Sequence, residues 1–550
     1  MTQTSSAPVV RYLGGESGHR SFFGGTHSRA RIILIGIFIT AGLVLTPLMG
    51  APGLIIGVLG CAVTFVLTAK THRGSILERR TKRERWKARV KTGTDAFVPY
   101  EVGAWDQLSE AAKNAGTKDE AWKAQRELTA MRAMPDGADG MGWLQYDANM
   151  PGIAWHAPTG EEPYLSVAFS VTGQLRGIES ESKMSRAAEA WGRFLASRAV
   201  PSSLVGDVQT LTRVLPADSV LQELWVQSSL DPAAPAEAVN SYAEVLRLTG
   251  DGAMVQRHYI IVKWPLTPTF YNTAERYARG RDGWRAVMEQ EIRSTVRGLK
   301  DARLGDVAAL SARQTAAIMK HQQNPTWPID YVRDIEPGNF GSPSHDEFSA
   351  YVVDDLDPTA GGVPTQWWHR TAKISAEALA TAPRTQLWPL DLLIGSELQF
   401  VRSISFHIHL IPAGEAKASA RQDLVRDLAD KQSKLEAGQL DVDDNGAGIT
   451  AASRRTQDLA SGSHHNGAAW VGFVTVSART RDGLARASRQ LEETCSTGLG
   501  IERLDWQDSY QSAAAGTTWP IARGTTAGGS SFSARVYDRL AGKSEKEALS

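Results

Sequence analysis

The chain has little cysteine, since only Cys61 and Cys495 occur among its 550 residues. Two thiols so far apart in the sequence exclude a disulfide framework and a thiolate zinc site, and they are typical of a reducing cytoplasm. A nucleotide-binding phosphate loop is also missing. The only Gly-Lys-Ser, at 542–544, has Tyr537 where the loop requires its leading glycine. We therefore expect that the protein has no intrinsic ATPase activity, is not an enzyme and binds no cofactor.

Charge is absent from one long stretch. Residues 32–69 contain no Lys, Arg, Asp, Glu, His, Asn or Gln, and these 38 residues far exceed the roughly 20 that one membrane-spanning helix needs. Pro47 and Pro52 mark a turn in the middle of the run, which predicts two spans near Ile32–Leu48 and Leu54–Ala69. The alternative is a helical hairpin buried in a protein core, but core helices of this length normally carry a polar stripe.

Basic residues flank this stretch on both sides. Residues 70–91 hold ten Lys or Arg and two Glu, and residues 1–69 hold four Arg and one Glu. Because basic flanks stay on the cytoplasmic side, we expect a multi-pass protein of the inner (plasma) membrane with both termini cytoplasmic. The residues expected to anchor it are Arg31, Pro47, Pro52, Lys70, Arg73, Arg79, Arg80, Lys82, Arg83, Arg85 and Trp86.

The basic stretch after the hairpin is rich in helix formers and predicts a helix that leaves the bilayer. Such a helix clamps anionic lipid headgroups, at about 1 kcal/mol per basic residue near the surface. The alternatives are that this helix serves only as a topological anchor, or that it binds nucleic acid. Residues 1–69 sum to +3 and residues 70–91 to +8, so that residues 92–550 carry −11 in a chain of net charge zero. An acidic body argues against direct nucleic-acid binding.

Strand and helix patterns alternate through this body. Strands are predicted at 163–175, 254–266, 400–411, 468–477 and 500–506, and helices at 180–200, 415–436 and 479–497. The order predicts an α+β body of ferredoxin-like, split β-α-β layers. The expected organisation is an N-terminal cytoplasmic segment (1–30), a transmembrane hairpin (31–69), a basic juxtamembrane helix (70–95), an α+β subdomain (96–322), a Pro/Gly-rich linker (323–366), a second α+β subdomain (367–523) and a flexible tail (524–550).

A family resemblance follows from these features. A basic-flanked two-helix hairpin after the aromatic-glycine motifs RYLGG and SFFGG resembles the small PrgI-like inner-membrane subunit of type IV secretion and conjugation systems. The acidic body resembles the N-terminal, non-catalytic domain of conjugation ATPases, with the closing order AWVGFVTVS, TRDGLARA, LDWQ and the element Trp519-Pro520-Ile521. The arrangement is similar to actinobacterial conjugation-associated membrane proteins that fuse these two parts without a motor domain.

Two short patterns suggest metal chemistry. His407 and His409 lie two apart on a predicted strand, as in histidine-pair nucleases that activate a phosphodiester for attack by a tyrosine, for which Tyr510 is the nearest candidate in sequence. Two solvent-facing strand histidines are the simpler interpretation. Residues 441–446 match half of a calcium loop, but Ala452 stands where the bidentate Glu belongs, and His464-His465 is typical of a solvated turn.

The function that the resemblance implies is a non-enzymatic scaffold subunit of a type IV secretion-like apparatus for conjugative DNA transfer. Its expected partners are a conjugation-type ATPase, channel subunits and membrane lipids, and a homo-oligomer is compatible with this role. The alternatives are a membrane-tethered, metal-dependent nuclease that uses His407 and His409, and a membrane-bound sensor whose segment Gln323–Gln366 binds a ligand.

Overall fold

The computed structural model describes most of the chain outside its two ends. The described residues are 11–13, 29–68, 76–158, 162–173, 179–216, 225–226, 228–231, 233–250, 253–358, 361–375, 378–379, 382–384, 388–394, 398–436, 453, 456–459, 465–501 and 503–524. The predicted tail, apart from Gly524, and most of the predicted N-terminal segment lie outside this set. Within the latter, β1 (Arg11–Leu13) pairs with β13 (Ala382–Arg384) of the body.

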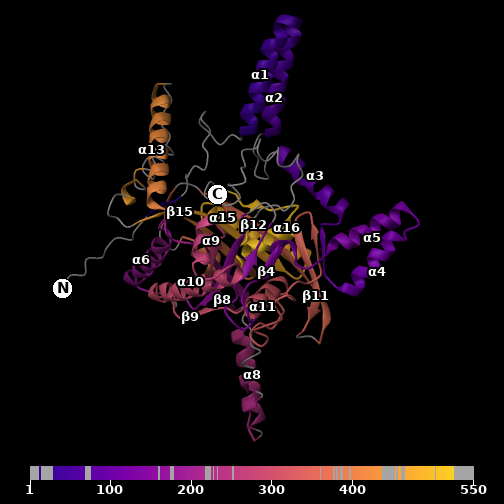
Figure 1. Cartoon of the computed structure of the whole chain (residues 1–550), viewed down its shortest axis with the longest axis vertical. Coiled ribbons are helices and arrows are strands. Elements are labelled where there is room, and N and C mark those ends of the chain that lie inside the picture. The colour runs from indigo at the N-terminus through magenta and orange to yellow at the C-terminus, as the bar shows by residue number, and fades with distance from the viewer. Residues whose placement is uncertain are drawn as a thin grey trace, which may run out of the picture.

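Two apolar helices follow β1 and pack side by side (Figure 1). They are α1 (Arg29–Met49) and α2 (Ala51–Thr68), and the turn between them is the single residue Gly50, whose φ of +66° favours glycine. Pro47 lies within α1 and Pro52 in the first turn of α2, where its missing N–H has no intrahelical partner to lose. The turn is therefore shorter than the sequence suggested.

Small residues let these helices approach closely. A Cβ atom added to Gly57 would lie 2.9 Å from the Cα of Gly42, so only glycine fits at this crossing. Large apolar side chains point away from the pair. Five of them are 59–77% exposed: Leu43, Val44, Leu48, Val58 and Leu59. Among the described residues, no helix combines the length and the apolar character that crossing a membrane requires.

The body is a mixed α/β structure built on one large sheet. The strands run in the order β3-β2-β10-β11-β12-β15-β14-β7-β8-β6-β5-β4, with β16 paired to β12 and β9 paired to β6. All these pairs are antiparallel except β2 with β3. The strand bounds are β2 (Ala96–Pro99), β3 (Met131–Arg132), β4 (Met141–Trp143), β5 (Ala154–His156), β6 (Tyr164–Val171), β7 (Asp207–Pro216), β8 (Met254–Pro265), β9 (Val307–Ala309), β10 (Ser344–Glu347), β11 (Ala350–Asp357), β12 (Val363–Ser375), β14 (Val401–Ile411), β15 (Gly467–Ala478) and β16 (Asp505–Trp506).

The same strand order occurs twice in this sheet. In the first unit, β6, β7, β8 and β9 lie side by side as β9-β6-β8-β7, and in the second unit β12, β14, β15 and β16 lie as β16-β12-β15-β14. In both units the third strand lies between the first and the second, and a helix follows the third strand. The second strands of the two units, β7 and β14, pair with each other from Val214–Arg402 to Asp207–His409. One continuous sheet therefore joins both units.

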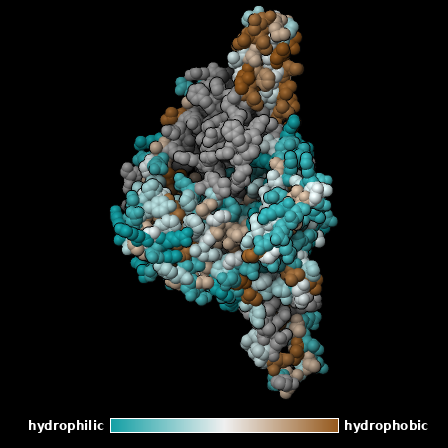
Figure 2. All heavy atoms as spheres, turned by 45° about the vertical axis from the view of Figure 1, so that its right-hand side comes forward, coloured by the Kyte–Doolittle hydropathy of each residue, from teal (hydrophilic) through white to brown (hydrophobic). Residues whose placement is uncertain are grey.

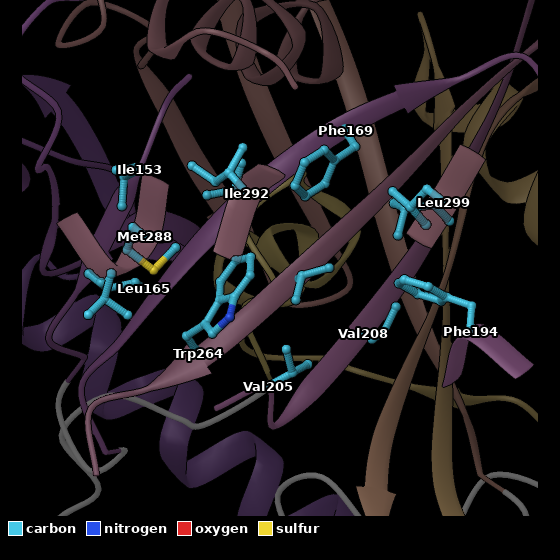
Figure 3. Close-up of a cluster of buried hydrophobic side chains, with 14 of the residues drawn as sticks. Ile153, Leu165, Phe169, Phe194, Val205, Val208, Trp264, Met288, Ile292 and Leu299 are labelled. Atoms are coloured by element: carbon cyan, nitrogen blue, oxygen red, sulfur yellow. The ribbon is translucent and has the colours of Figure 1, made fainter. Parts of the chain in front are cut away.

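Helices cover one face of the sheet over two apolar cores. Over the first unit, α6 (Glu181–Arg198) and α10 (Arg281–Asp301) pack on a core that includes Phe169, Trp264 and Met288 (Figure 3). Over the second unit, α12 (Leu390–Ile394) and α15 (Arg481–Thr497) close a core that contains the buried Cys495. The remaining helices are α3 (Ile76–Thr92), α4 (Val102–Lys113), α5 (Lys118–Ala130), α8 (Ala236–Gly250), α9 (Pro268–Glu275), α11 (Ala312–Gln323), α13 (Ala413–Glu436) and α16 (Gln511–Ala515).

The opposite face is polar where β7 and β14 meet, and the chain itself covers it. We call residues 507–523 the C-terminal strap; it contains α16 and a short 3-10 turn, Gly516–Thr518. Gln209 on β7 donates from Nε2 to the carbonyl oxygens of Thr517 and Trp519, at 3.2 and 3.0 Å, and accepts from the N–H of Ala522 at 2.8 Å. Trp519 is 2% exposed, so the strap is an integral part of the core.

Two helical arms leave the sheet in opposite directions (Figure 1). The first, α8, is inserted between β7 and β8, and the second, α13, between β14 and β15. These are equivalent places, since both join the second and third strands of a unit. Because β7 and β14 are antiparallel, α13 points to the side that carries α1 and α2, and α8 points away from it.

The segment 323–366 is not the linker that its Pro and Gly content predicted. It contains β10, β11 and the first residues of β12. Within the sheet β10 pairs with β11, where Glu347 lies opposite Ala350, and β11 pairs with β12, where Asp357 lies opposite Val363. Proline and glycine occur in the turns before β10, at 336–343, and between β11 and β12, at Gly361 and Gly362, so the composition was read correctly as turns and wrongly as a continuous loop.

Candidate functional site on helix α3

Helix α3 connects the apolar helix pair to the body, and one of its faces is attached to the body. Lys82, Trp86 and Arg89 recur at helical spacing on this face. Lys82 Nζ donates to the carbonyl oxygen of Trp506 at 2.8 Å and lies 3.5 Å from Asp505 Oδ1. The ring of Trp86 meets the ring of Phe348 edge-on, with centroids 6.5 Å apart. The attachment therefore combines charge pairing with aromatic packing.

Arg89 is the most deeply buried residue of this face, with an exposed fraction of 6%. Its Nη1 lies 2.5 Å from Asp346 Oδ2 and its Nη2 lies 3.0 Å from Asp136 Oδ2. The same guanidinium donates to the carbonyl oxygens of Ser509 and Thr94, at 2.8 Å each, and stacks on the ring of Tyr510, 3.9 Å from its centroid. One side chain thus joins α3 to β10, to the turn at 136 and to the strap.

Asp346 accepts bonds from both sides of this junction. The backbone N–H and the hydroxyl of Ser512 each donate to the Asp346 carboxylate at 2.8 Å, opposite Arg89. Burial raises the pKa of Asp346 to about 6, although Arg89 favours the ionised form, and the neighbouring Asp136 adds to the rise. The negative charge of the ionised Asp346 carboxylate is consequently compensated mainly by Arg89.

The other face of α3 is a basic row that points away from the body. Arg79, Arg83, Lys87 and Lys91 are exposed and recur every four residues, and Arg80 is exposed beside them. Lys87 pairs with Glu84 at 3.2 Å, a contact between two exposed side chains that adds little stability. The row can bind phosphate and other anions by charge, and its position follows the apolar helices directly.

The sequence-predicted anchoring residues fall into distinct groups. Arg79, Arg80 and Arg83 belong to the exposed row, Lys82 and Trp86 face the body, and Arg85 is half-buried. Arg31 lies in the first turn of α1, and Lys70 and Arg73 are outside the described residues. Sequence reasoning missed Arg89, although its spacing of seven from Lys82 was a signal that it shares that residue's face.

The histidine pair lies elsewhere, on β14, in two different environments. His407 is 3% exposed, its Nε2 is 2.8 Å from the Thr517 carbonyl oxygen, and its ring meets Phe473 edge-on. Burial lowers the pKa of His407 to about 4, so the neutral ring donates from Nε2 to the strap. His409 is half-exposed, with Nδ1 2.8 Å from Asp207 Oδ1, and this bond raises its pKa. The interpretation of two solvent-facing histidines is therefore wrong for His407.

For the other predictions of metal chemistry, the described residues provide no set of metal ligands. Tyr510 stacks on Arg89 rather than on the histidine pair. In the described part of the chain, no three His, Cys, Asp or Glu side chains are grouped as a metal site. The half-calcium loop at 441–452 and His464 lie outside the described residues, as does the Gly-Lys-Ser at 542–544.

Comparison with known proteins adds no relative. No protein-family model matches the chain, and no curated protein matches it. The functional argument therefore rests on the geometry of α3 and its surroundings, together with the resemblance described above.

Proposed function

We propose that the protein is a non-enzymatic scaffold subunit of the inner (plasma) membrane that belongs to a type IV secretion-like conjugative DNA-transfer apparatus and docks a separate ATPase. The observation that carries the scaffold role is the attachment of α3. One face of this helix is fixed to the body through Lys82, Trp86 and Arg89, and the opposite face presents a basic row at the base of an apolar helix pair. The assignment to a secretion apparatus rests on the family resemblance.

The proposed membrane anchor rests on the uncharged run of residues 32–69 and not on the described helices alone. Figure 2 shows the apolar surface of the helix pair as a hydrophobic projection from a largely hydrophilic body. The basic row of α3 would lie against anionic headgroups, with both termini cytoplasmic, because basic flanks are retained on that side. A rigid α3 attachment would then hold the body at a set orientation to the bilayer.

We also propose that the two repeated units of the sheet are ferredoxin-like. Their strand order, fourth-first-third-second, with α6 and α10 in the first unit and α12 and α15 in the second, supports this classification. The likeness of the body to the N-terminal domain of conjugation ATPases is consistent with such layers. ATP hydrolysis would come from a partner, because the Gly-Lys-Ser at 542–544 has Tyr537 where a phosphate loop requires its leading glycine.

The test has two arms. The native host expresses either the full-length chain or a version that lacks residues 32–69. Its membranes are extracted with carbonate and floated on a density gradient. The full chain should stay with the membrane, and the deletion should not. Solubilised complexes are then purified through a tag on each version. Co-purification of a conjugation-type ATPase and channel subunits with the full chain supports the proposal, and purification of the chain alone refutes the secretion assignment.

The nuclease alternative finds less support in the geometry. The Nε2 of His407 is engaged by Thr517, and the Nδ1 of His409 is engaged by Asp207. A nuclease of this kind needs two imidazoles that face one metal ion with a third ligand. Metal binding by the purified chain that is abolished by His407→Ala would favour this alternative over the scaffold.

A further inference from the structure

The α8 arm, defined here as residues 225–250, lies at the end of the molecule opposite α1 and α2 (Figure 1). It is an insertion between β7 and β8, and all the described side chains of α8 are exposed or half-buried. A helix that extends from the body in this way gains little stability from the body's core. Its exposed surface therefore requires an explanation other than folding.

Apolar side chains form a row along this arm. Tyr242, Val245 and Leu248 recur at intervals of three residues and are 41%, 50% and 59% exposed, and Trp225 and Leu230, which precede the helix in the sequence, are 63% and 46% exposed. Figure 2 shows hydrophobic atoms gathered on the corresponding projection below the body. Large apolar and aromatic side chains placed together on an exposed helix are typical of a helix that lies in the groove of another protein.

Acidic residues accompany the apolar row. The arm, residues 225–250, holds three acidic residues and one basic residue, a net charge of −2: Asp231, Glu237, Glu244 and Arg247. Glu237 and Glu244 are exposed and lie two turns apart, on one side of α8. The arm is therefore both apolar and negatively charged. A complementary surface has an apolar groove with a basic rim.

Three kinds of partner could bind the arm: a lipid bilayer, a second copy of the chain or a separate protein. A bilayer with anionic lipids would repel the arm, and the arm points away from the proposed membrane side. A second copy would bring a second negative arm, and its own basic row on α3 lies at the other end of the molecule, next to the helix pair. A separate protein can supply the basic groove without either conflict.

We infer that the α8 arm docks a separate protein through an apolar groove with a basic rim. This inference rests on the proposed scaffold role, in which the docked protein is the ATPase, and it assigns the docking to the end of the body farthest from the membrane anchor. The apolar row supplies the buried contact, and the carboxylates at its edge select the basic partner.

The experiment uses the full-length chain in the native host, with a photo-crosslinking amino acid at position 248. The crosslinked protein is identified by mass spectrometry, purified by itself, and titrated against the detergent-solubilised full chain. The test variant is Val245→Ser with Leu248→Ser. The matched control is Val425→Ser with Leu428→Ser, an exposed Val and Leu with the same spacing on α13, the equivalent arm of the second unit.

The inference predicts one basic crosslinked protein, a weakening of its binding by about tenfold or more in the test variant, and no change in the control variant. Binding should also weaken as salt is raised. Crosslinks only to another copy of the chain, only to lipid, or to nothing would overturn the inference. Equal weakening in both variants would overturn it as well.

The outcomes separate this inference from the scaffold proposal. If the ATPase still co-purifies with the test variant as well as with the unaltered chain, the scaffold role stands and the docking site is elsewhere. If the arm crosslinks to a basic protein that is not an ATPase and no ATPase co-purifies, the docking arm stands and the secretion assignment falls.

Discussion

Replacing Arg89 should release α3 from the body in a pH-dependent way. Arg89→Ala removes the guanidinium that bonds to Asp346 at 2.5 Å and to Asp136 at 3.0 Å, together with donors to two carbonyl oxygens. Breaking a buried ion pair from one side costs about 3–5 kcal/mol, because the remaining charge is buried without compensation. The remaining charge here is the Asp346 carboxylate, whose side chain is fully buried.

The sign of the pH dependence follows from Asp346. Its pKa of about 6 in the folded protein is above the ordinary value of 3.8, so the folded state holds the proton more tightly than the unfolded state. The stability that this group contributes is present below about pH 4 and is lost as the pH rises through 6. Without Arg89 the pKa of Asp346 rises further, and the loss extends to higher pH. The cost of Arg89→Ala should therefore be largest at pH 8 and smaller at pH 5, where the carboxyl group can be protonated.

Hydrogen–deuterium exchange of the full-length chain in detergent micelles measures this cost. Protection of α3, β10 and the strap should fall by about 150- to 5,000-fold at pH 8, after correction for intrinsic exchange rates, since each 1.36 kcal/mol is a factor of ten. Asp346→Asn in the Arg89→Ala background should restore part of the protection. Arg83→Ala, an exposed position on the same helix, is the control. Equal effects of Arg83→Ala and Arg89→Ala, or a cost that does not change with pH, would refute the reasoning.

Further predictions concern the strap and the strand histidine. Gln209→Leu leaves the Ala522 N–H without its acceptor, at a cost of about 1–3 kcal/mol, and strap peptides should exchange faster while α6 peptides do not. Trp519→Ala, at a buried site, should cost about 3–5 kcal/mol and lower the thermal midpoint, and an unchanged midpoint would contradict the packing described here. His409 has a pKa raised above 6.5 by Asp207, so its stabilisation is complete below that pH and is lost as the pH rises through the folded-state pKa. His409→Gln should remove this part of the pH profile of the thermal midpoint, and an identical profile would argue against the pairing.

Elements with regular periodicity could be predicted from the sequence. The predicted strand 254–266 is β8 (Met254–Pro265), the predicted strand 400–411 is β14 (Val401–Ile411), and the predicted helix 479–497 is α15 (Arg481–Thr497). Each alternates or repeats its apolar residues over ten or more positions, which is the strongest local signal available. The predicted strand at 500–506 is reduced to the two residues of β16.

Features that depend on distant contacts could not be predicted. Strand β10 has only four residues, and sequence rich in Pro and Gly precedes β10 and follows β11, so the local sequence does not indicate the pairing of β10 with β2 or of β11 with β12. The burial of Arg89 and His407 has the same origin. Arg89 lies in a basic stretch and His407 on a strand of alternating apolar residues, and each is buried because the strap, more than 100 residues away in sequence, lies over it.

The strap also has a consequence for the order of events during synthesis. The β7 residues that it covers are made about 300 residues before it, and a ribosome that adds about 5–20 residues per second needs on the order of 15–60 s for that distance. During this interval Gln209 lacks the strap atoms to which it bonds in the folded protein. The sheet face is completed only when residues 507–523 emerge, so the strap is the last described part of the body to take its place.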